Sequence, residues 1–312
     1  MVTGRHKILA RYRSYHGGTA GAITLTGDPR RWAAEPGIPG VVRVMDPYHG
    51  IQRGWDTADE ALANLEETIQ LEGPNTIAAF ILETVTGTNG ILVPPDGYLQ
   101  GVREICDRYG ILMVCDEVMA GFGRTGKWFA VQNWDVVPDL MTMAKGLTSS
   151  YLPLGAVAMR HDIAQAFETK MFYGGLTYSS HPVSLAAALA TIGVYEDDDL
   201  IGNSARMGAV MRRHHEALAA KHPSVGTHRN IGLFGIIELV RSHDPYVPMT
   251  GFNGTSDEMK AVGKHLRENG LYTMVVNNAI HTNPPLCITE EQLAEGFAII
   301  DGALDLADEA LR

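Results

Sequence analysis

Two residues of this sequence have types and positions that could do chemistry together. Asp116 lies near the end of the apolar run GILMVCDE (110–117), and Lys145 ends a second apolar run, DLMTMAK (139–145). A carboxylate at the carboxyl end of a buried strand can bind a metal, serve as a base or pair with a cation. A lysine that is removed from water loses its proton more readily and becomes a nucleophile for carbonyls. The spacing corresponds to one βα unit plus a strand, so we expect both side chains to reach one sheet edge.

An amine and a carboxylate at one edge are what pyridoxal phosphate chemistry requires. The amine bonds to the aldehyde of the cofactor, and the carboxylate holds the pyridine nitrogen protonated. Side chains alternate along a strand, so Glu117 should point to the face opposite Asp116. We therefore expect only Asp116 of this acid pair to face the site.

Three glycines follow the acid pair in the literal pattern G-x-G-x-x-G, at Gly121, Gly123 and Gly126. A dinucleotide fingerprint needs its first glycine directly at a strand-to-helix turn. Here four residues (117–120) intervene, and the following KWFAVQNWDVVPDL lacks a long amphipathic helix. We therefore interpret the glycines as a tightly packed loop with positive φ angles. A nicotinamide-dependent oxidoreductase that uses Gly121–Gly126 is kept as a second alternative.

Short apolar runs alternate with helical patterns over the first part of the chain. A helix is expected over 57–71, with a capping box of Thr57 and Glu60, and another over 95–110, closed by Gly110. Runs without polar alternation predict strands covered on both faces, as in a parallel, doubly wound sheet. The predicted strands are 41–44, 76–83, 110–117, 139–145 and 155–160.

The pattern of predicted helices and strands changes after about residue 181. A mostly helical stretch is followed by a predicted strand (232–240), a polar loop (241–257) and a helix (257–270). A strand-like run (271–276) and a last amphipathic helix (289–311) complete the chain. This order indicates a smaller α+β domain after a large α/β domain, with expected boundaries of 1–195 and 196–312.

With these residues in hand, the sequence resembles the class III, omega-type aminotransferases of pyridoxal-phosphate fold type I. The core match is DEVMAGFGRTGKWFAVQNWDVVPDLMTMAKGL (116–147), which combines the acid pair, the glycine loop, PDL and Lys-Gly. The segments SYHGGTAGA, ETVTGTNGILVPPDGYL, GLTYSSHPVSLAAALA and NPPLCITEEQL are similar to family landmarks and stand in family order. The resemblance covers essentially the whole chain and is closest to the taurine–pyruvate and omega-amino-acid–pyruvate transaminases.

The resemblance implies a catalytic pair. Lys145 would bond to the cofactor and then move the proton between substrate carbon and cofactor, and Asp116 would pair with the pyridine nitrogen. It also implies further cofactor-binding residues: Tyr15 and Val118 on the two ring faces, Thr177 on the phosphate of the partner subunit's cofactor, and His16, Glu83 and Met119. Tyr15 and Val118 could instead be packing residues, Thr177 a helix cap, and Glu83 a solvated acid. His16 and His181 share no metal spacing, and no metal site is expected.

The sequence also departs from the family pattern. Family members usually carry a first strand and a Ser-Gly-rich phosphate-binding turn before MVTGRHKI, so we expect an N-terminally truncated chain that binds pyridoxal phosphate poorly. Met119 stands where many members have a hydrogen-bonding Gln. No arginine lies between Arg267 and Arg312, where the family often clamps a substrate carboxylate. A catalytically impaired, dimerising remnant is therefore the first alternative to an active enzyme.

Composition restricts the partners. The net charge of −11 and the lack of a basic run disfavour nucleic-acid binding, and no apolar run approaches the roughly 18 residues of a membrane span. The three cysteines share no metal or redox spacing, which favours free thiols in a cytoplasmic protein. We expect an amine donor and a keto-acid acceptor as substrates, and a homodimer or higher oligomer.

Overall fold

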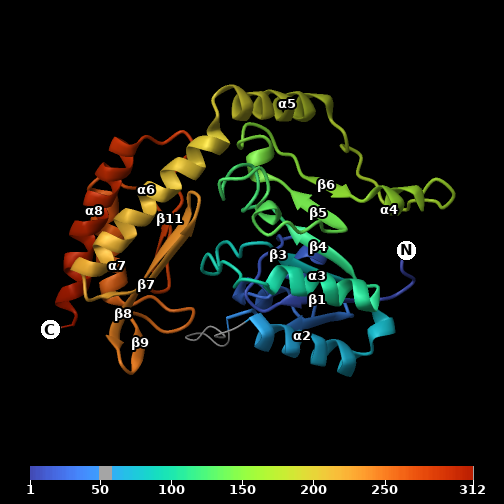
Figure 1. Ribbon diagram of the computed structural model, residues 1–312, viewed down its shortest axis with the longest axis horizontal. Helices are drawn as coiled ribbons and strands as arrows, with labels where there is room; N and C mark the ends of the chain where they lie inside the picture. Colours follow the sequence, from blue (N-terminus) through green and yellow to red (C-terminus); the bar gives the residue numbers. More distant parts are fainter. Residues whose placement is uncertain (49–57, 312) are drawn as a thin grey trace. The chain divides into compact units, whose positions relative to one another are not determined.

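The computed structural model describes residues 1–48 and 58–311, and its chain divides into two compact units. Within the described residues the first unit holds 1–48, 58–122 and 127–199. The second holds 200–311 together with the short segment Gly123–Gly126. Each unit has its own sheet and its own core (Figure 1).

The first unit is built on a six-stranded sheet in the order β2-β1-β3-β4-β5-β6. All neighbouring pairs are parallel except β5 with β6. Its strands are β1 (Lys7–Arg11), β2 (Val41–Val44), β3 (Ile77–Glu83), β4 (Leu112–Asp116), β5 (Leu140–Met143) and β6 (Ala156–Met159). The mixed, mostly parallel sheet that the apolar runs predicted is confirmed.

The described residues of the first unit form five α-helices and four 3-10 turns. The α-helices are α1 (Ala20–Leu25), α2 (Ala58–Glu72), α3 (Tyr98–Tyr109), α4 (His161–Gln165) and α5 (Pro182–Asp197). The 3-10 turns are η1 (Pro29–Ala34), η2 (Pro74–Thr76), η3 (Ala130–Asn133) and η4 (Lys145–Leu147). Helix α2 buries Ala61, Leu65 and Ile69 at spacings of four residues, and it packs beside α3 (Figure 1). Gly110 ends α3 with a left-handed φ of 59°.

Two features of the first unit differ from the sequence predictions or fall beyond them. Strand β1, which lies between β2 and β3, was not predicted, because the basic residues around KILAR obscure its short apolar run. Its last residue, Arg11, is buried and donates hydrogen bonds to the Glu83 carbonyl and to Thr86 Oγ1. The predicted capping residue Thr57 lies outside the described residues.

The second unit packs helices on an antiparallel sheet in the order β10-β11-β8-β7, with β9 paired to β8. Its strands are β7 (Val225–Ile231), β8 (Phe234–His243), β9 (Tyr246–Pro248), β10 (Val275–Val276) and β11 (Ala279–Thr282). Its helices are α6 (Leu200–Lys221), α7 (Asp257–Glu268) and α8 (Glu290–Glu309). The loop predicted at 241–257 is wrong in its first part, where β8 continues to His243 and β9 forms. Only the end of the run 271–276 is a strand.

Two glycines of the loop, Gly123 and Gly126, belong to the second unit. Gly123 and Gly126 have φ angles of 87° and 81°. A Cβ on Gly123 would lie 2.6 Å from Ile201 Cδ1, and one on Gly126 would lie 3.2 Å from the Ala205 backbone. The glycines therefore serve positive φ and close packing, which is the interpretation preferred from the sequence. In the described part of the chain, no helix is long and apolar enough to cross a membrane.

Candidate active site

The carboxyl ends of three neighbouring strands bring the candidate residues together. In the parallel register Glu83 of β3 is the partner of Asp116 of β4, and Asp116 is the partner of Thr142 of β5. Lys145 follows three residues later, at the start of η4. This is the edge at which open α/β sheets bind ligands, because strand ends leave backbone groups and side chains free there.

Asp116 is held in one orientation by two neighbours. His16 Nδ1 lies 2.7 Å from Asp116 Oδ2, and the backbone N–H of Val118 donates to Oδ1 at 3.0 Å. An ionised carboxylate only accepts hydrogen bonds, so His16 Nδ1 carries the proton in this contact. Both side chains are almost fully buried, with exposed fractions of 2% for His16 and 6% for Asp116. The pair thus keeps a fixed carboxylate at the sheet edge.

Glu117 points away from this site, as strand alternation predicted. Its carboxylate accepts hydrogen bonds from Thr84 Oγ1 at 2.7 Å and from the backbone N–H groups of Ala130 and Val131 at 2.9 Å each. Burial raises the pKa of Glu117, and these donors oppose the rise. Its role is to anchor the start of η3.

Glu83 joins two loops to the sheet edge. Its Oε1 accepts from the backbone N–H of Tyr15 at 2.9 Å, and its Oε2 accepts from that of Gly87 at 2.7 Å. Burial raises the pKa of Glu83; the charge of His16 opposes that rise and the charge of Asp116 adds to it. The solvated strand-end acid considered from the sequence is wrong, because Glu83 is buried.

Lys145 has an unusual backbone and a shifted amine. Its φ of 42° lies in the left-handed region, which non-glycine residues adopt rarely and mostly where the surroundings require it. The residue is accessible to solvent, yet protein packed around the amine lowers the pKa of Lys145 by desolvation. The carboxylates of Asp116 and Glu83 act in the opposite sense, and Arg30 adds to the lowering. The amine is therefore close enough to both acids to interact with them electrostatically.

Arg30 is a site residue that the sequence analysis missed. Its guanidinium carbon lies 3.6 Å from the centre of the Tyr15 ring, a cation–π contact. Asp28 holds it by paired hydrogen bonds from Nε, at 3.1 and 2.9 Å, and from Nη2. In this structure Arg30 covers one face of Tyr15. The only available signal was its position in the GDPRR turn after SYHGG, which does not reveal a contact across the loop.

The remaining candidates are placed less centrally. Val118 and Met119 are half-buried directly after Asp116, and a Cβ on Gly87 would lie 2.3 Å from Met119 Sδ, so Met119 packs on that glycine. Thr177 is exposed in the segment before α5, whose N-cap is His181. Thr177 is therefore not the helix cap that the sequence also allowed. Within the described residues it makes no hydrogen bond to the group around Asp116.

The donor set fits pyridoxal phosphate at its ring and aldehyde ends. Asp116 offers a fixed, buried carboxylate for a protonated ring nitrogen. Lys145 offers an amine for the aldehyde, and desolvation lowers the pKa of this amine. Two buried atoms beside Asp116, His16 Nε2 and Thr142 Oγ1, have no hydrogen-bond partner among the described residues. Buried polar atoms are rarely unpaired, so this edge suits a further polar group.

A mostly parallel sheet that carries a lysine and a buried aspartate at its carboxyl edge defines the pyridoxal-phosphate enzymes of fold type I. The chain belongs to the class III aminotransferase family, whose sequence model matches residues 1–304. This family depends on pyridoxal phosphate, so both the resemblance and the cofactor predicted from the sequence are confirmed. Nothing supports a nicotinamide-dependent oxidoreductase, and the glycines of the 121–126 loop serve close packing: Gly121 meets Glu117 and Phe129, while Gly123 and Gly126 pack within the second unit.

Three similar proteins place the chain within the family. It is 36% identical over 311 residues to a putrescine–pyruvate aminotransferase of Pseudomonas aeruginosa, covering 96% of this chain and 66% of that protein. It is 35% identical to a taurine–pyruvate aminotransferase of Bilophila wadsworthia, covering 97% and 69%. A taurine:2-oxoglutarate aminotransferase from Bifidobacterium kashiwanohense, solved with pyridoxal phosphate and glutamate, has a TM-score of 0.95 and 42% identity, covering 100% and 72%. The chain spans about two thirds of the length of the curated relatives it matches.

Proposed function

We propose that this chain transfers an amino group from an omega-amino acid or amine to a keto acid with pyridoxal phosphate. The proposal is carried by the surroundings of the Lys145 amine at the sheet edge. Desolvation lowers the pKa of Lys145, and the amine interacts electrostatically with the carboxylates of Asp116 and Glu83. The relatives support the substrate class, since they are named for putrescine, taurine, pyruvate and 2-oxoglutarate.

Each residue has a separate task in this proposal. When bound, the cofactor supplies an electron sink for the carbanion at the substrate carbon. Lys145 would accept the proton from that carbon and return it, and desolvation, which lowers the pKa of Lys145, favours the neutral amine that this task needs. Asp116 keeps the ring nitrogen protonated, and His16 fixes the orientation of Asp116. Glu83 positions the Tyr15 loop through the Tyr15 N–H.

The proposed active form is a homodimer. Helix α5 has apolar residues around its circumference, and Val183, Leu185 and Leu189 on it are exposed. Such a helix is normally buried. The adjacent segment exposes Met171, Phe172, Tyr173, Leu176 and Tyr178. A second copy would cover this surface and place Thr177 at the cofactor phosphate of its partner. We also propose a cytoplasmic location, supported by the three free cysteines.

Titration of the purified chain with pyridoxal phosphate tests the proposal directly. At high cofactor concentration, which weak binding would require, we expect a visible absorption band that is lost in Lys145→Ala and kept in Lys127→Ala, which removes an exposed lysine of the same unit. Turnover with pyruvate is then compared for taurine, beta-alanine, putrescine and 1-phenylethylamine. A band that survives in Lys145→Ala, or no turnover with any donor, would contradict the proposed activity.

A further inference from the structure

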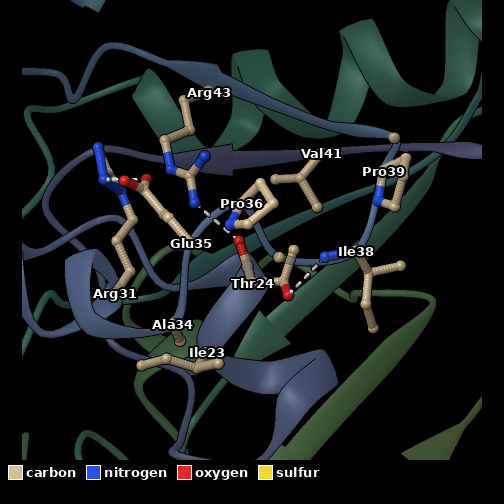
Figure 2. Close-up of a pocket in the computed structure, with 12 residues that line it drawn as sticks. Ile23, Thr24, Arg31, Ala34, Glu35, Pro36, Ile38, Pro39, Val41 and Arg43 are labelled. Atoms are coloured by element: carbon tan, nitrogen blue, oxygen red, sulfur yellow. Dashed lines mark hydrogen bonds and ion pairs between the residues drawn. The ribbon is translucent and has the colours of Figure 1, made fainter.

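A polar pocket lies in the first unit, and its lining residues are different from those of the candidate active site. It has a volume of about 140 Å³ and is formed by α1, η1, the loop 35–40 and β2 (Figure 2). Lys145, Asp116 and Glu83 do not line it. Its polar lining consists of Arg31, Glu35 and Arg43 together with Thr24.

The two arginines of this pocket are only partly satisfied. Arg43 Nη2 donates to the carbonyl oxygens of Thr24 and Thr26, at 2.7 and 2.9 Å. Arg31 Nη1 donates to Glu35 Oε1 at 2.8 Å (Figure 2). The Nε atoms of both guanidinium groups are buried and have no hydrogen-bond partner in the described part of the chain. A buried donor without an acceptor is destabilising, so the described residues do not satisfy all the hydrogen-bonding capacity of the two guanidinium groups that line this pocket.

The charges in the pocket do not cancel. Two guanidinium groups face one carboxylate, that of Glu35, which leaves one positive charge. The two cations also affect each other, because the pKa of Arg43 is lowered by burial and further by Arg31, while Glu35 opposes this. Glu35 is half exposed, so its carboxylate can move aside in favour of another anion.

The rest of the lining is apolar and sets the shape of a ligand. It comprises Ile23, Ala34, Pro36, Ile38, Pro39 and Val41. An engineered cavity of roughly 150 Å³ holds benzene, a molecule of six heavy atoms. A ligand of about this size would place a charged end at the arginines and an apolar end against these side chains.

We propose that this pocket binds a small monocarboxylate, whose oxygens accept hydrogen bonds from Arg31 and Arg43 while its short hydrocarbon part packs on the apolar lining. A carboxylate matches the single net charge and the paired N–H donors of a guanidinium. The pocket requires no chemistry at Lys145, so it stands apart from the transfer of amino groups.

Calorimetric titration with butyrate, which has six heavy atoms, tests this site. The titration uses the Lys145→Ala background, which removes the amine of the active site. We expect saturable binding that weakens at least tenfold in Arg31→Gln, because one charge-assisted contact is lost. Glu35→Gln should tighten binding several-fold, because it removes the competing carboxylate. Arg108→Gln is the matched control, since this exposed arginine pairs with Glu66 outside the pocket and should leave binding unchanged.

Three outcomes would overturn the proposal. The first is the absence of saturable butyrate binding. The second is equal binding of the neutral amide butyramide, or an unchanged affinity in both Arg31→Gln and Glu35→Gln. The third is tighter binding of inorganic phosphate than of butyrate, which would assign the pocket to a different anion. Arg31 is chosen over Arg43 because Arg43 also donates hydrogen bonds to the carbonyls of Thr24 and Thr26, so its loss could disturb the fold. Thermal melts of each variant check that it is folded.

Discussion

At the scale of single residues, the contact between His16 and Asp116 fixes the orientation of the Asp116 carboxylate. The two residues are 100 positions apart in the sequence and lie 2.7 Å apart in the fold. The remaining acceptor positions of the carboxylate can then serve a cationic ring. In the proposed function His16 would act on the cofactor through Asp116, as a positioning residue.

The first prediction concerns the charge of Asp116. Asp116→Asn keeps the size of the side chain and removes the negative charge that would hold a ring nitrogen protonated. We expect the rate of amino transfer to fall by roughly 10²–10³-fold, the usual cost of losing one electrostatic contact to the transition state. Single-turnover absorbance measurements with saturating cofactor separate this loss of rate from a loss of binding. An unchanged rate would remove Asp116 from the mechanism.

Arg30 supplies a second prediction at this scale. Its charge lowers the pKa of Lys145, as burial does more strongly. Arg30→Gln should therefore raise the apparent pKa of Lys145, because a nearby like charge is removed. The pH dependence of Lys145 modification by trinitrobenzenesulfonate, followed by mass spectrometry, measures this shift. The neighbouring variant Arg31→Gln, whose native arginine pairs with Glu35, is the control. A fall in the pKa would contradict the prediction.

At the scale of elements, Glu117 joins β4 to η3 and so connects the end of the central sheet to the following turn. The buried carboxylate of Glu117 accepts three hydrogen bonds, from Thr84 Oγ1 and from the N–H groups of Ala130 and Val131. The acid pair at 116–117 therefore has a divided role, with Asp116 facing the site and Glu117 supporting the backbone that follows it.

Removal of Glu117 should cost stability more than it costs chemistry. Glu117→Ala leaves three donors without an acceptor, and we expect the free energy of unfolding to fall by about 3 kcal/mol or more. Urea unfolding followed by circular dichroism measures the loss. Glu104→Ala, on the exposed side of α3, should change stability by less than about 0.5 kcal/mol. Equal effects of the two substitutions would show that Glu117 is not an anchor.

At the scale of the whole molecule, burial of neutral histidines makes the second unit sensitive to acid. Burial lowers the pKa of His215 to about 3 and that of His281 to about 4. In the unfolded chain both would titrate near 6.5. Above about pH 6.5 both histidines are neutral in the folded and the unfolded chain, and their contribution to the free energy of unfolding is fully present. As the pH falls from there toward the pKa values of the folded chain, only the unfolded chain gains protons, and this contribution is lost.

The matching prediction uses His281→Asn, which removes one of these titrating groups. Between pH 6 and pH 5 the wild-type stability should fall more steeply than that of the variant, by up to roughly 1.4 kcal/mol per pH unit. Urea titrations at each pH measure the two slopes. His243→Asn, at an exposed histidine of the same unit, serves as the control and should keep the wild-type slope. Parallel curves for wild type and His281→Asn would contradict the argument.

Assembly also belongs to this scale. Leu189 on α5 and Leu71 on α2 are both strongly exposed, at 71% and 82%. If α5 is the dimer surface, Leu189→Glu should give a monomer by light scattering because it buries a charge in the interface, whereas Leu71→Glu should not. A dimer that survives Leu189→Glu, or a wild-type chain that is monomeric at all concentrations, would exclude this surface.

The sequence by itself predicted most strands of the first unit and the pairing of Asp116 with Lys145 at one sheet edge. Apolar runs of four to eight residues without polar alternation indicate buried parallel strands. Strands β2 to β6 all formed where such runs stand, but β6 was wrongly expected to be buried and parallel: it is an edge strand, antiparallel to β5 and largely exposed. Strand ends in a parallel sheet share one edge, so Asp116 and Lys145 could be assigned to one site from their positions alone. The family motifs, which are also local strings, led to the same residues.

Only the tertiary structure decided which distant groups meet. It placed β1 between β2 and β3, His16 against Asp116, Arg30 over Tyr15, and the segment Gly123–Gly126 in the second unit. It also gathered Arg31 and Arg43 with Glu35 into one pocket. These contacts depend on how separate elements pack, and periodicity and motifs report only on neighbours along the chain. Local patterns therefore predict the elements and their ends, whereas contacts between elements follow from the packing of the whole core.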